Sequence, residues 1–288
     1  MNIFNDCFPC IVRGSLDAAR LATDDEILHQ KIMKQVMQAL IDQEADYPPP
    51  MMARHTFKVV RALTGVADPY REIKQKYNRF AMDLFDGLQT MVSDSENPFE
   101  TAVRLAIAGN IIDFGAKSAV THDEVHATIT DTLSNSIKGD IQAFEDRVGR
   151  ARNILWLADN AGEIVFDQLL VDILGRDRVT YVVRGGYAMN DATLEDAAQI
   201  GILDKLTVID SGFDLPGTLV ERCSPGFRKA YEQADLIISK GQGNYETLSH
   251  EDSRIFFLFK VKCPIIARHS GHDFHDAVIL NGQNRCGC

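Results

Sequence analysis

Polar side chains that can bind a cation follow two apolar runs in the second half of the chain. Asp159 and Asn160 come directly after the run at residues 153–157, and Asp191 lies a few positions beyond the run at 179–183. Two carboxylates and an amide oxygen are hard ligands of the kind that magnesium and manganese prefer. Three protein ligands leave coordination positions for water and a phosphate oxygen, so these residues are the expected ligands of one divalent metal ion.

Lysines and glycines follow two later apolar runs. The set expected to hold a phosphate comprises Lys240, Gly241, Gly243, Asn244 and Lys260. Lysine neutralises phosphate charge, and glycine lets backbone amides approach an anion closely. A metal ion and lysines around one phosphoryl group would support phosphoryl transfer, in which catalysis consists mainly of positioning and charge stabilisation.

Each of these motifs also has a structural interpretation. Asp159 and Asn160 could cap a helix, and Asp191 could belong to a turn, because both residue types accept backbone amide hydrogen bonds. The segment at 240–244 has neither a Walker nor a GxGxxG pattern, so it could be a simple turn. Lys260 ends an apolar run and must reach water or an anionic partner. The position that all of them share, at the ends of apolar runs, favours the functional interpretation.

The apolar runs predict a parallel β-sheet that would bring these residues together. Five short runs alternate with helical patterns, at residues 153–157, 179–183, 206–209, 236–238 and 255–259. Continuous apolar runs are typical of parallel strands that are covered on both faces, and this alternation is typical of a doubly wound α/β fold. Ligands bind such sheets beyond the carboxyl ends of the strands.

The first third of the chain has a different pattern. Apolar residues recur at helical spacing up to about residue 92, as in the stripe of Ile32, Val36 and Leu40. Residues 93–98 are polar and end in proline. The sequence therefore predicts a small all-helical domain at 1–95, followed by an α/β domain at 96–288.

Composition narrows the class of protein. The chain has 288 residues, of which 45% are hydrophobic and 25% charged, as in ordinary globular proteins. The net charge of −11 repels nucleic acid, although a metal ion or a lysine can still attract a small anion. No apolar stretch approaches the roughly 18 residues of a membrane helix, and no signal peptide is evident. We therefore expect a cytoplasmic protein with neither a nucleic acid nor a membrane as partner; its oligomeric state is left open.

Six cysteines are too few for a disulfide scaffold. Cys7 and Cys10 form a CxxC pair, and Cys286 and Cys288 form a CxC pair at the other end. The two pairs could supply four thiolates to one zinc ion if the ends of the chain meet. We favour ordinary thiols, because a second CxxC is absent.

Five segments in combination resemble the damage-control metal-phosphatase family, also known as domain of unknown function 89 or the ARMT-like domain. They are LADNAGEIVFD at 157–167, AMNDAT at 188–193, ISKGQGNYE at 238–246, AGNIID at 108–113 and FLFKVK at 257–262. The resemblance covers nearly the whole chain, and the CxxC is similar to that of the short prokaryotic branch. The cysteine-rich C-terminus does not follow a family pattern.

The resemblance implies a helical domain packed on a three-layer, Rossmann-like α/β/α sandwich, with one divalent metal ion (Mn, Co, Ni or Mg) in the cleft. It implies that Asp159, Asn160 and Asp191 are the metal ligands, and that Lys240, the glycine loop after it and Lys260 hold the phosphate. Asn110 and Asp113 are expected to line the same cleft, although they could also be polar-face residues of a helix.

We therefore expect a divalent-metal-dependent phosphatase that hydrolyses phosphomonoesters of small metabolites, such as sugar phosphates or damaged and side-product phosphates. Asp159 and Asn160 are the expected catalytic residues. Asp159 could attack phosphorus directly or orient a metal-activated water, and we favour direct participation because it is the first polar group after the strand. One alternative is an S-adenosylmethionine-dependent carboxyl methyltransferase, which would need a glycine-rich turn where this chain has Asp159 and Asn160. Another is a non-catalytic, metal-dependent metabolite-binding module.

Overall fold

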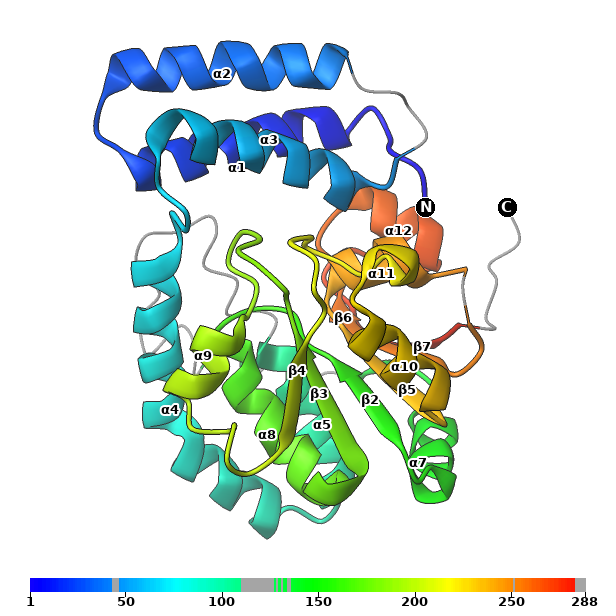
Figure 1. Ribbon diagram of the computed structural model, residues 1–288. Helices are drawn as coiled ribbons and strands as arrows, with labels where there is room; N and C mark the ends of the chain where they lie inside the picture. Colours follow the sequence, from blue (N-terminus) through cyan, green and yellow to red (C-terminus); the bar gives the residue numbers. More distant parts are fainter. Residues whose placement is uncertain are drawn as a thin grey trace.

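The computed structural model describes residues 1–42, 47–109, 127, 129–130, 132–133, 136–250 and 252–282. These residues form eleven α-helices and a seven-stranded sheet. Helices cover both faces of the sheet, and three further helices lie across one end of it (Figure 1). The predicted α/β class, with an α/β/α sandwich and helices at the N-terminus, is confirmed.

All five predicted strands are present, each within a few residues of its expected range. They are β2 (Ile154–Leu157), β3 (Val179–Val183), β4 (Thr207–Asp210), β5 (Leu236–Lys240) and β6 (Ile255–Lys260), and all of them are parallel. Two strands were not predicted: β7 (Ala277–Asn281) is antiparallel to β6, and the two-residue β1 (Lys138–Gly139) pairs with β7. The order across the sheet is β1-β7-β6-β5-β2-β3-β4.

The strand order reverses beside β2, where a doubly wound sheet is expected to have a crevice. From β2 the chain continues outward to β3 and β4, and then returns to the other side of β2 to form β5. The direction of winding therefore reverses between β2 and β5. In open parallel sheets, the carboxyl ends of the two strands at such a reversal are the usual ligand site.

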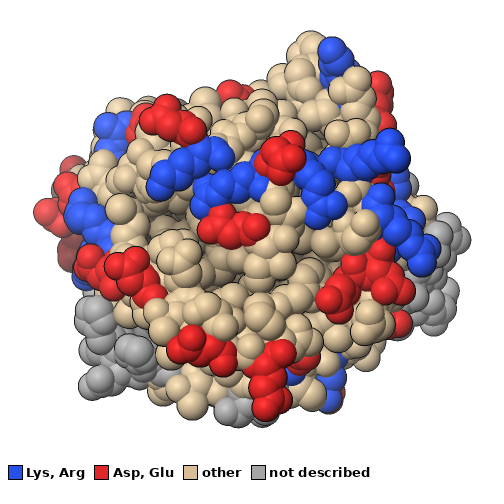
Figure 2. Space-filling view, turned by 90° about the horizontal axis from the view of Figure 1, so that it is seen from below, with Lys and Arg blue, Asp and Glu red and all other residues tan. Residues whose placement is uncertain are grey.

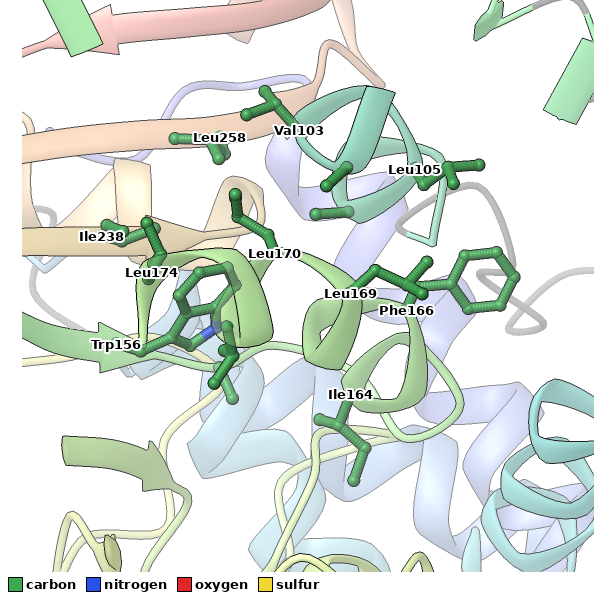
Figure 3. Packing of buried hydrophobic residues seen from close by; sticks show 14 of the residues in the cluster. Val103, Leu105, Trp156, Ile164, Phe166, Leu169, Leu170, Leu174, Ile238 and Leu258 are labelled. Carbon is green, nitrogen blue, oxygen red and sulfur yellow. The ribbon is translucent and has the colours of Figure 1, made fainter. Parts of the chain in front are cut away.

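One face of the sheet is covered by five helices. They are α4 (Arg71–Asp94), α5 (Pro98–Gly109), α7 (Ile141–Arg150), α8 (Glu163–Leu174) and α9 (Leu194–Gln199). Helix α8 is buried on nearly all sides because it lies between the sheet and α4 and α5. Figure 3 shows Leu170 of α8 between Trp156 of β2 and Val103 of α5, and Leu169 beside Phe166.

The opposite face is covered by α10 (Pro225–Gln233), α11 (Gln242–Leu248) and α12 (Pro264–Ser270). Their aromatic residues Phe227 and Tyr245 pack with Phe257 and Phe259 of β6. Proline at the first helical position and a side-chain cap start both α10 and α12, where the amide donor that proline lacks is not needed. Two short 3₁₀ helices, Arg176–Arg178 and Val220–Arg222, complete the described elements.

Helices α1 (Cys7–Ala22), α2 (Glu26–Ile41) and α3 (Pro49–Thr64) have a hydrophobic cluster of their own. They lie over the carboxyl ends of the strands (Figure 1). Arg54 and Arg61 of α3 bind the carboxylate of Asp214 in the segment after β4, at 2.6 and 2.8 Å. The packing changes between Tyr70, which belongs to this cluster, and Tyr77, which belongs to the core around α8. This change comes earlier than the boundary expected at residue 95, and the division into two domains stays a prediction.

None of the helices in the described part of the chain is long and apolar enough to cross a membrane. On the side that faces away from α1–α3, lysine and arginine side chains form a band with acidic side chains on both sides of it (Figure 2).

Candidate functional site

The turn after β2 lies against the loop after β3. The carbonyl oxygen of Asp159 accepts a hydrogen bond from the amide of Ala192 at 2.8 Å. Asn160 and Asp191 form an isolated antiparallel bridge. The structure therefore brings Asp159, Asn160 and Asp191 together at the carboxyl ends of β2 and β3, where the sequence places them. Their role as metal ligands stays a prediction.

The loop after β3 is anchored to the N-terminal helices through Met189. The backbone of Met189 is left-handed, with φ of 53°, which is uncommon for a residue other than glycine. Its side chain packs against the hydrophobic cluster of α1–α3. Such a conformation costs free energy and persists where the surroundings impose it, which is frequent at functional sites.

The Asn160 amide is held in one orientation. Its Nδ2 donates to Oδ2 of Asp159 at 2.8 Å and to Oε2 of Glu163 at 3.0 Å. Both acceptors are carboxylate oxygens, so they identify the nitrogen side of the amide. The other atom, Oδ1, is an oxygen donor of the type that a hard cation binds.

Arg184 joins the two acidic residues of the site. Its Nε lies 2.5 Å from Oδ2 of Asp191, and its Nη2 lies 3.6 Å from Oδ1 of Asp159. Nη1 donates to the carbonyl oxygen of Gly217 and to Oδ1 of Asn244, both at 3.0 Å. Arg184 is not among the residues that the sequence predicts for the site. The position of Arg184 directly after β3, at the same edge of the sheet as the two acids, is the feature of the sequence that indicates a role.

The glycine-rich segment after β5 packs tightly around the site. Gly241 has a φ of +79°, and a side chain there would collide with the carboxylate of Asp159. A side chain on Gly243 would collide with the carbonyl oxygen of Pro216. The Asn244 amide is fully engaged within the fold, because its Nδ2 donates to the backbone and its Oδ1 accepts from Arg184. The segment therefore fixes Asp159 and Arg184, and contact with phosphate stays a prediction for it.

Lys240 is not where the sequence predicts. Its ammonium group is 0% exposed and faces the core around α8, away from the crevice. It donates to Glu163 and Asp167 at 2.6 Å each, and to the carbonyl oxygen of Ala106 at 2.8 Å. These three acceptors match the three protons of an ammonium group. In this arrangement Lys240 has no donor left for a phosphate.

Asp167 closes this buried network on its far side. Its Oδ2 accepts hydrogen bonds from Nε1 of Trp156 at 3.0 Å and from the hydroxyl of Tyr181 at 2.6 Å. A continuous chain of contacts therefore runs from Asn160 through Glu163 and Lys240 to Asp167. Glu163 and Asp167 are buried acids one helical turn apart on α8. Two acids at this spacing in an otherwise apolar helix are the feature of the sequence that indicates such a network, and the predicted site does not include them.

Burial and like charges raise the pKa of Asp159 and of Asp167. The pKa of Asp159 lies well above its usual range, because burial penalises the carboxylate and because Asp191 and Glu163 repel it. Burial also raises the pKa of Asp167, to about 6, against the opposing effect of Lys240. The same carboxylates outweigh the burial of Lys240 and raise its pKa above the ordinary lysine value. The region therefore carries more buried negative charge than its cations balance.

Lys260 and Lys262 lie at the end of β6. Lys260 is its last residue and is half-buried, as a lysine at the end of an apolar strand requires. Lys262 acts electrostatically on Asp159 and lowers its pKa. Lys262 belongs to the segment FLFKVK at 257–262 that resembles the family, but it is not among the residues predicted to bind phosphate. A contact of Lys260 with phosphate stays a prediction.

Four predicted residues lie outside the described part of the chain: Asn110, Asp113, Cys286 and Cys288. Cys7 is half-buried and Cys10 exposed, and both are free thiols. Across the residues that the structure describes, no group of three or more His, Cys, Asp or Glu side chains is arranged to hold a metal. A zinc site of the four terminal cysteines stays untested.

The residues at the crevice have the donor chemistry of a divalent-cation site. The predicted ligand set consists of two carboxylates and one amide, so it does not contain three His, Cys, Asp or Glu side chains. Among the described residues, four buried carboxylates (Asp159, Glu163, Asp167 and Asp191) adjoin two buried cations, Arg184 and Lys240. When all four acids are ionised, two negative charges remain, which a divalent cation would balance. The residues present therefore fit such an ion.

A hollow of about 390 Å³ lies elsewhere, at the beginning of β2 and β3. It is lined by Asn153, Leu155, Thr180 and residues of α10. None of the residues with the chemistry described above lines it, so we place the candidate site at the other end of the strands.

Comparison with known proteins identifies the family of the chain. Residues 3–278 match the family model described as the damage-control phosphatase ARMT1-like domain. The chain is 32% identical to a damage-control phosphatase of Archaeoglobus fulgidus, over 96% of this chain and 98% of that protein. It is 34% identical to a damage-control phosphatase of Pyrococcus horikoshii, over 93% of this chain and 94% of that protein. The crystal structure of a DUF89 family protein from Pyrococcus horikoshii superposes with a TM-score of 0.90 at 31% identity, covering 98% of this chain and 100% of the other.

Proposed function

The chain belongs to the damage-control phosphatase ARMT1-like family, and we propose that it hydrolyses phosphomonoesters of small metabolites with one divalent metal ion. The observation that carries this proposal is the convergence of Asp159, Asn160 and Asp191 beside Arg184 at the reversal point of the sheet. Oxygen ligands together with a guanidinium group suit a phosphoryl group, whose charge must be balanced for water to attack.

Each residue of the site has a distinct part in this proposal. Asp159, Asn160 and Asp191 hold the metal ion, which when bound supplies Lewis-acid polarisation of a phosphoryl oxygen. Glu163 holds the Asn160 amide through its nitrogen, which would leave Oδ1 available to the ion. Gly241 leaves the space that the Asp159 carboxylate occupies. Helices α1–α3 cover this end of the sheet (Figure 1), and we propose that they contribute to contact with the metabolite.

A phosphatase screen tests the proposal. Metal-free protein would be assayed with p-nitrophenyl phosphate and a panel of sugar phosphates, after addition of Mn²⁺, Co²⁺, Ni²⁺ or Mg²⁺. We expect turnover that a chelator abolishes and that Asp159→Ala reduces by at least a hundredfold. Asp172→Ala is the matched control, because Asp172 is an exposed acid of α8 that pairs with Arg176 far from the crevice.

The alternatives give different results in the same screen. Saturable, metal-dependent binding of a phosphorylated metabolite without turnover would identify a binding module. Transfer of the methyl group of S-adenosylmethionine to a carboxylate, without phosphate release, would identify a methyltransferase. Either result would overturn the phosphatase proposal.

Trapping of a covalent intermediate tests the part played by Asp159. Direct attack by the carboxylate breaks the ester P–O bond, releases the alcohol and forms an aspartyl phosphate, which borohydride reduces to a homoserine side chain at position 159 in protein quenched during turnover. Attack by water forms no such intermediate and leaves Asp159 unreduced. We propose the first course, which the position of Asp159 at the end of β2 supports.

A further inference from the structure

Within the described part of the chain, the buried guanidinium of Arg184 has one nitrogen without a hydrogen bond. Nε is bound to Asp191, and Nη1 donates to Gly217, Thr218 and Asn244. Nη2 is buried and has no hydrogen-bond partner among the described residues. Oδ1 of Asp159 lies 3.6 Å from Nη2, which is too far for a hydrogen bond.

An unsatisfied buried donor is costly and calls for an explanation. Leaving such a group unpaired costs about 1–3 kcal/mol. Arg184 is only 4% exposed, so bulk water does not satisfy the two protons of Nη2. The rest of the guanidinium is held by four residues from three segments of the chain, so its position is fixed. Nη2 is therefore a fixed donor directed at the carboxylate pair.

If Asp159 and Asp191 hold a metal ion, the ion and the guanidinium of Arg184 are two positive charges close together. A cation bound by Asp159 and Asp191 has the guanidinium as a close neighbour, because the guanidinium adjoins both carboxylates. Two positive groups at such a separation repel one another in a buried site. A phosphate oxygen placed between them is attracted by both and also satisfies Nη2.

We propose that Arg184 binds a phosphoryl oxygen of the substrate through Nη2 and thereby makes the binding of metal ion and phosphate mutually dependent. This inference rests on the proposed function, because the metal ion belongs to that proposal. By linkage, phosphate must tighten the binding of the metal ion by the same factor by which the metal ion tightens the binding of phosphate. Arg184 therefore determines how strongly the binding of the metal ion and the binding of phosphate depend on each other, rather than the affinity for either one alone.

Calorimetric titration of metal-free protein with Mn²⁺, in the absence and presence of inorganic phosphate, measures this coupling without turnover. For the wild-type protein we expect phosphate to tighten Mn²⁺ binding about tenfold. For Arg184→Met we expect phosphate to have no effect on Mn²⁺ binding. Mn²⁺ alone should bind the variant as tightly as the wild type or more tightly, because a repelling charge is gone.

A purely structural role for Arg184 predicts the opposite direction. If Arg184 only positions Asp159 and Asp191, Arg184→Met weakens Mn²⁺ binding in the absence of phosphate, and that result would overturn the inference. Coupling that survives in Arg184→Met would overturn it as well. Arg178→Met is the matched control, because Arg178 also donates to backbone carbonyl groups but lies at the beginning of β3. In Arg178→Met, phosphate should tighten Mn²⁺ binding by the same factor as in the wild type.

Arg184→Lys decides the question if the methionine variant fails to fold. Lysine keeps the positive charge but has a single nitrogen that cannot bind Asp191 and a phosphate in the same fork geometry. We expect its coupling to fall at least threefold, and unchanged coupling would overturn the inference. Absence of Mn²⁺ binding by the wild type would overturn the metal part of the proposed function. Coupling without any phosphatase turnover would overturn the phosphatase proposal alone.

Discussion

The carboxylate of Asp159 occupies the space that a side chain on Gly241 would need. The two residues come from β2 and β5, the strands between which the winding of the sheet reverses. Glycine at 241 is thus required twice, by its positive φ and by the close approach of the acid.

Gly241→Ala should therefore damage both stability and the site. Left-handed backbone at a residue with a side chain costs about 1–3 kcal/mol, and the new methyl group must also displace Asp159. We expect a lower urea midpoint and Mn²⁺ binding weakened by at least tenfold. Gly149→Ala is the control, since Gly149 lies in helix α7 with open space around it, and should stabilise by about 0.5–1 kcal/mol. Equal effects of the two substitutions would contradict the role of Gly241.

Asp159→Asn should stabilise the metal-free protein while it abolishes metal binding. The pKa of Asp159 is raised by burial and by Asp191 and Glu163, so the ionised form is disfavoured in the folded state at neutral pH. Asparagine cannot ionise, so the substitution should remove this penalty and raise the free energy of unfolding of the metal-free protein.

Thermal unfolding of metal-free protein at pH 7.5 and at pH 4 checks this. The gain should be present at pH 7.5 and should shrink as the pH falls, because folded wild-type protein then takes up the proton that relieves the penalty. Mn²⁺ should raise the melting temperature of the wild type and leave that of the variant unchanged. Asp172→Asn, at an exposed ion pair, should change stability by less than about 1 kcal/mol. A variant less stable than the wild type at pH 7.5 would contradict the charge argument.

Lys240→Met should unfold the protein more readily rather than simply weaken substrate binding. Removing the lysine leaves Glu163 and Asp167 buried together, and breaking a buried ion pair costs about 3–5 kcal/mol. Adding Asp167→Asn should recover part of that loss, which urea denaturation measures. Lys229→Met, at an exposed lysine of α10, should have little effect. A variant of unchanged stability with a raised KM for p-nitrophenyl phosphate would instead support the phosphate contact that the sequence predicts.

The stability of the wild type should fall between pH 5 and 8 because of Glu246. Burial raises the pKa of Glu246 to about 7, above the ordinary value near 4.5, while a hydrogen bond from Gln242 opposes the shift. The folded state therefore favours the protonated acid, and the penalty grows as the pH rises from about 4.5 to about 7 and is complete above that. Glu246→Gln should stabilise by up to about 3 kcal/mol at pH 8 and by nothing at pH 4.

Chemical denaturation of both proteins across this pH range is the measurement. Glu232→Gln, at an exposed glutamate of α10, serves as the control and should give a difference that does not change with pH. A constant difference between wild type and Glu246→Gln from pH 4 to 8 would contradict the shifted pKa.

The sequence predicts the sheet well because its central strands are buried on both faces. Continuous apolar runs identify β2 to β6 to within a few residues. Strand β1 has two residues, too few for any pattern, and β7 is an antiparallel addition with no helical pattern after it to suggest another βα unit.

The candidate site is only partly predictable from the same pattern. Position at strand ends is enough to bring Asp159 and Asp191 together, because parallel strands end at one edge of the sheet. It does not show to which face of the sheet a side chain points when both faces are buried. For this reason Lys240 was expected at the crevice, although it faces the core, and Arg184 was overlooked, although it adjoins both acids.

Helices α1–α3 and the sheet domain contact each other through side chains from both parts. Arg54 and Arg61 of α3 bind Asp214 in the segment after β4, and Met189 from the loop after β3 packs among α1–α3. Residues 1–65 therefore cannot be replaced by the same helices of a relative without changes elsewhere in the chain. A chimera that takes these helices from a relative must also take the segments around residues 185–191 and 211–217. Recombination between family members, in the laboratory or in evolution, should accordingly yield folded products when all three stretches share one parent.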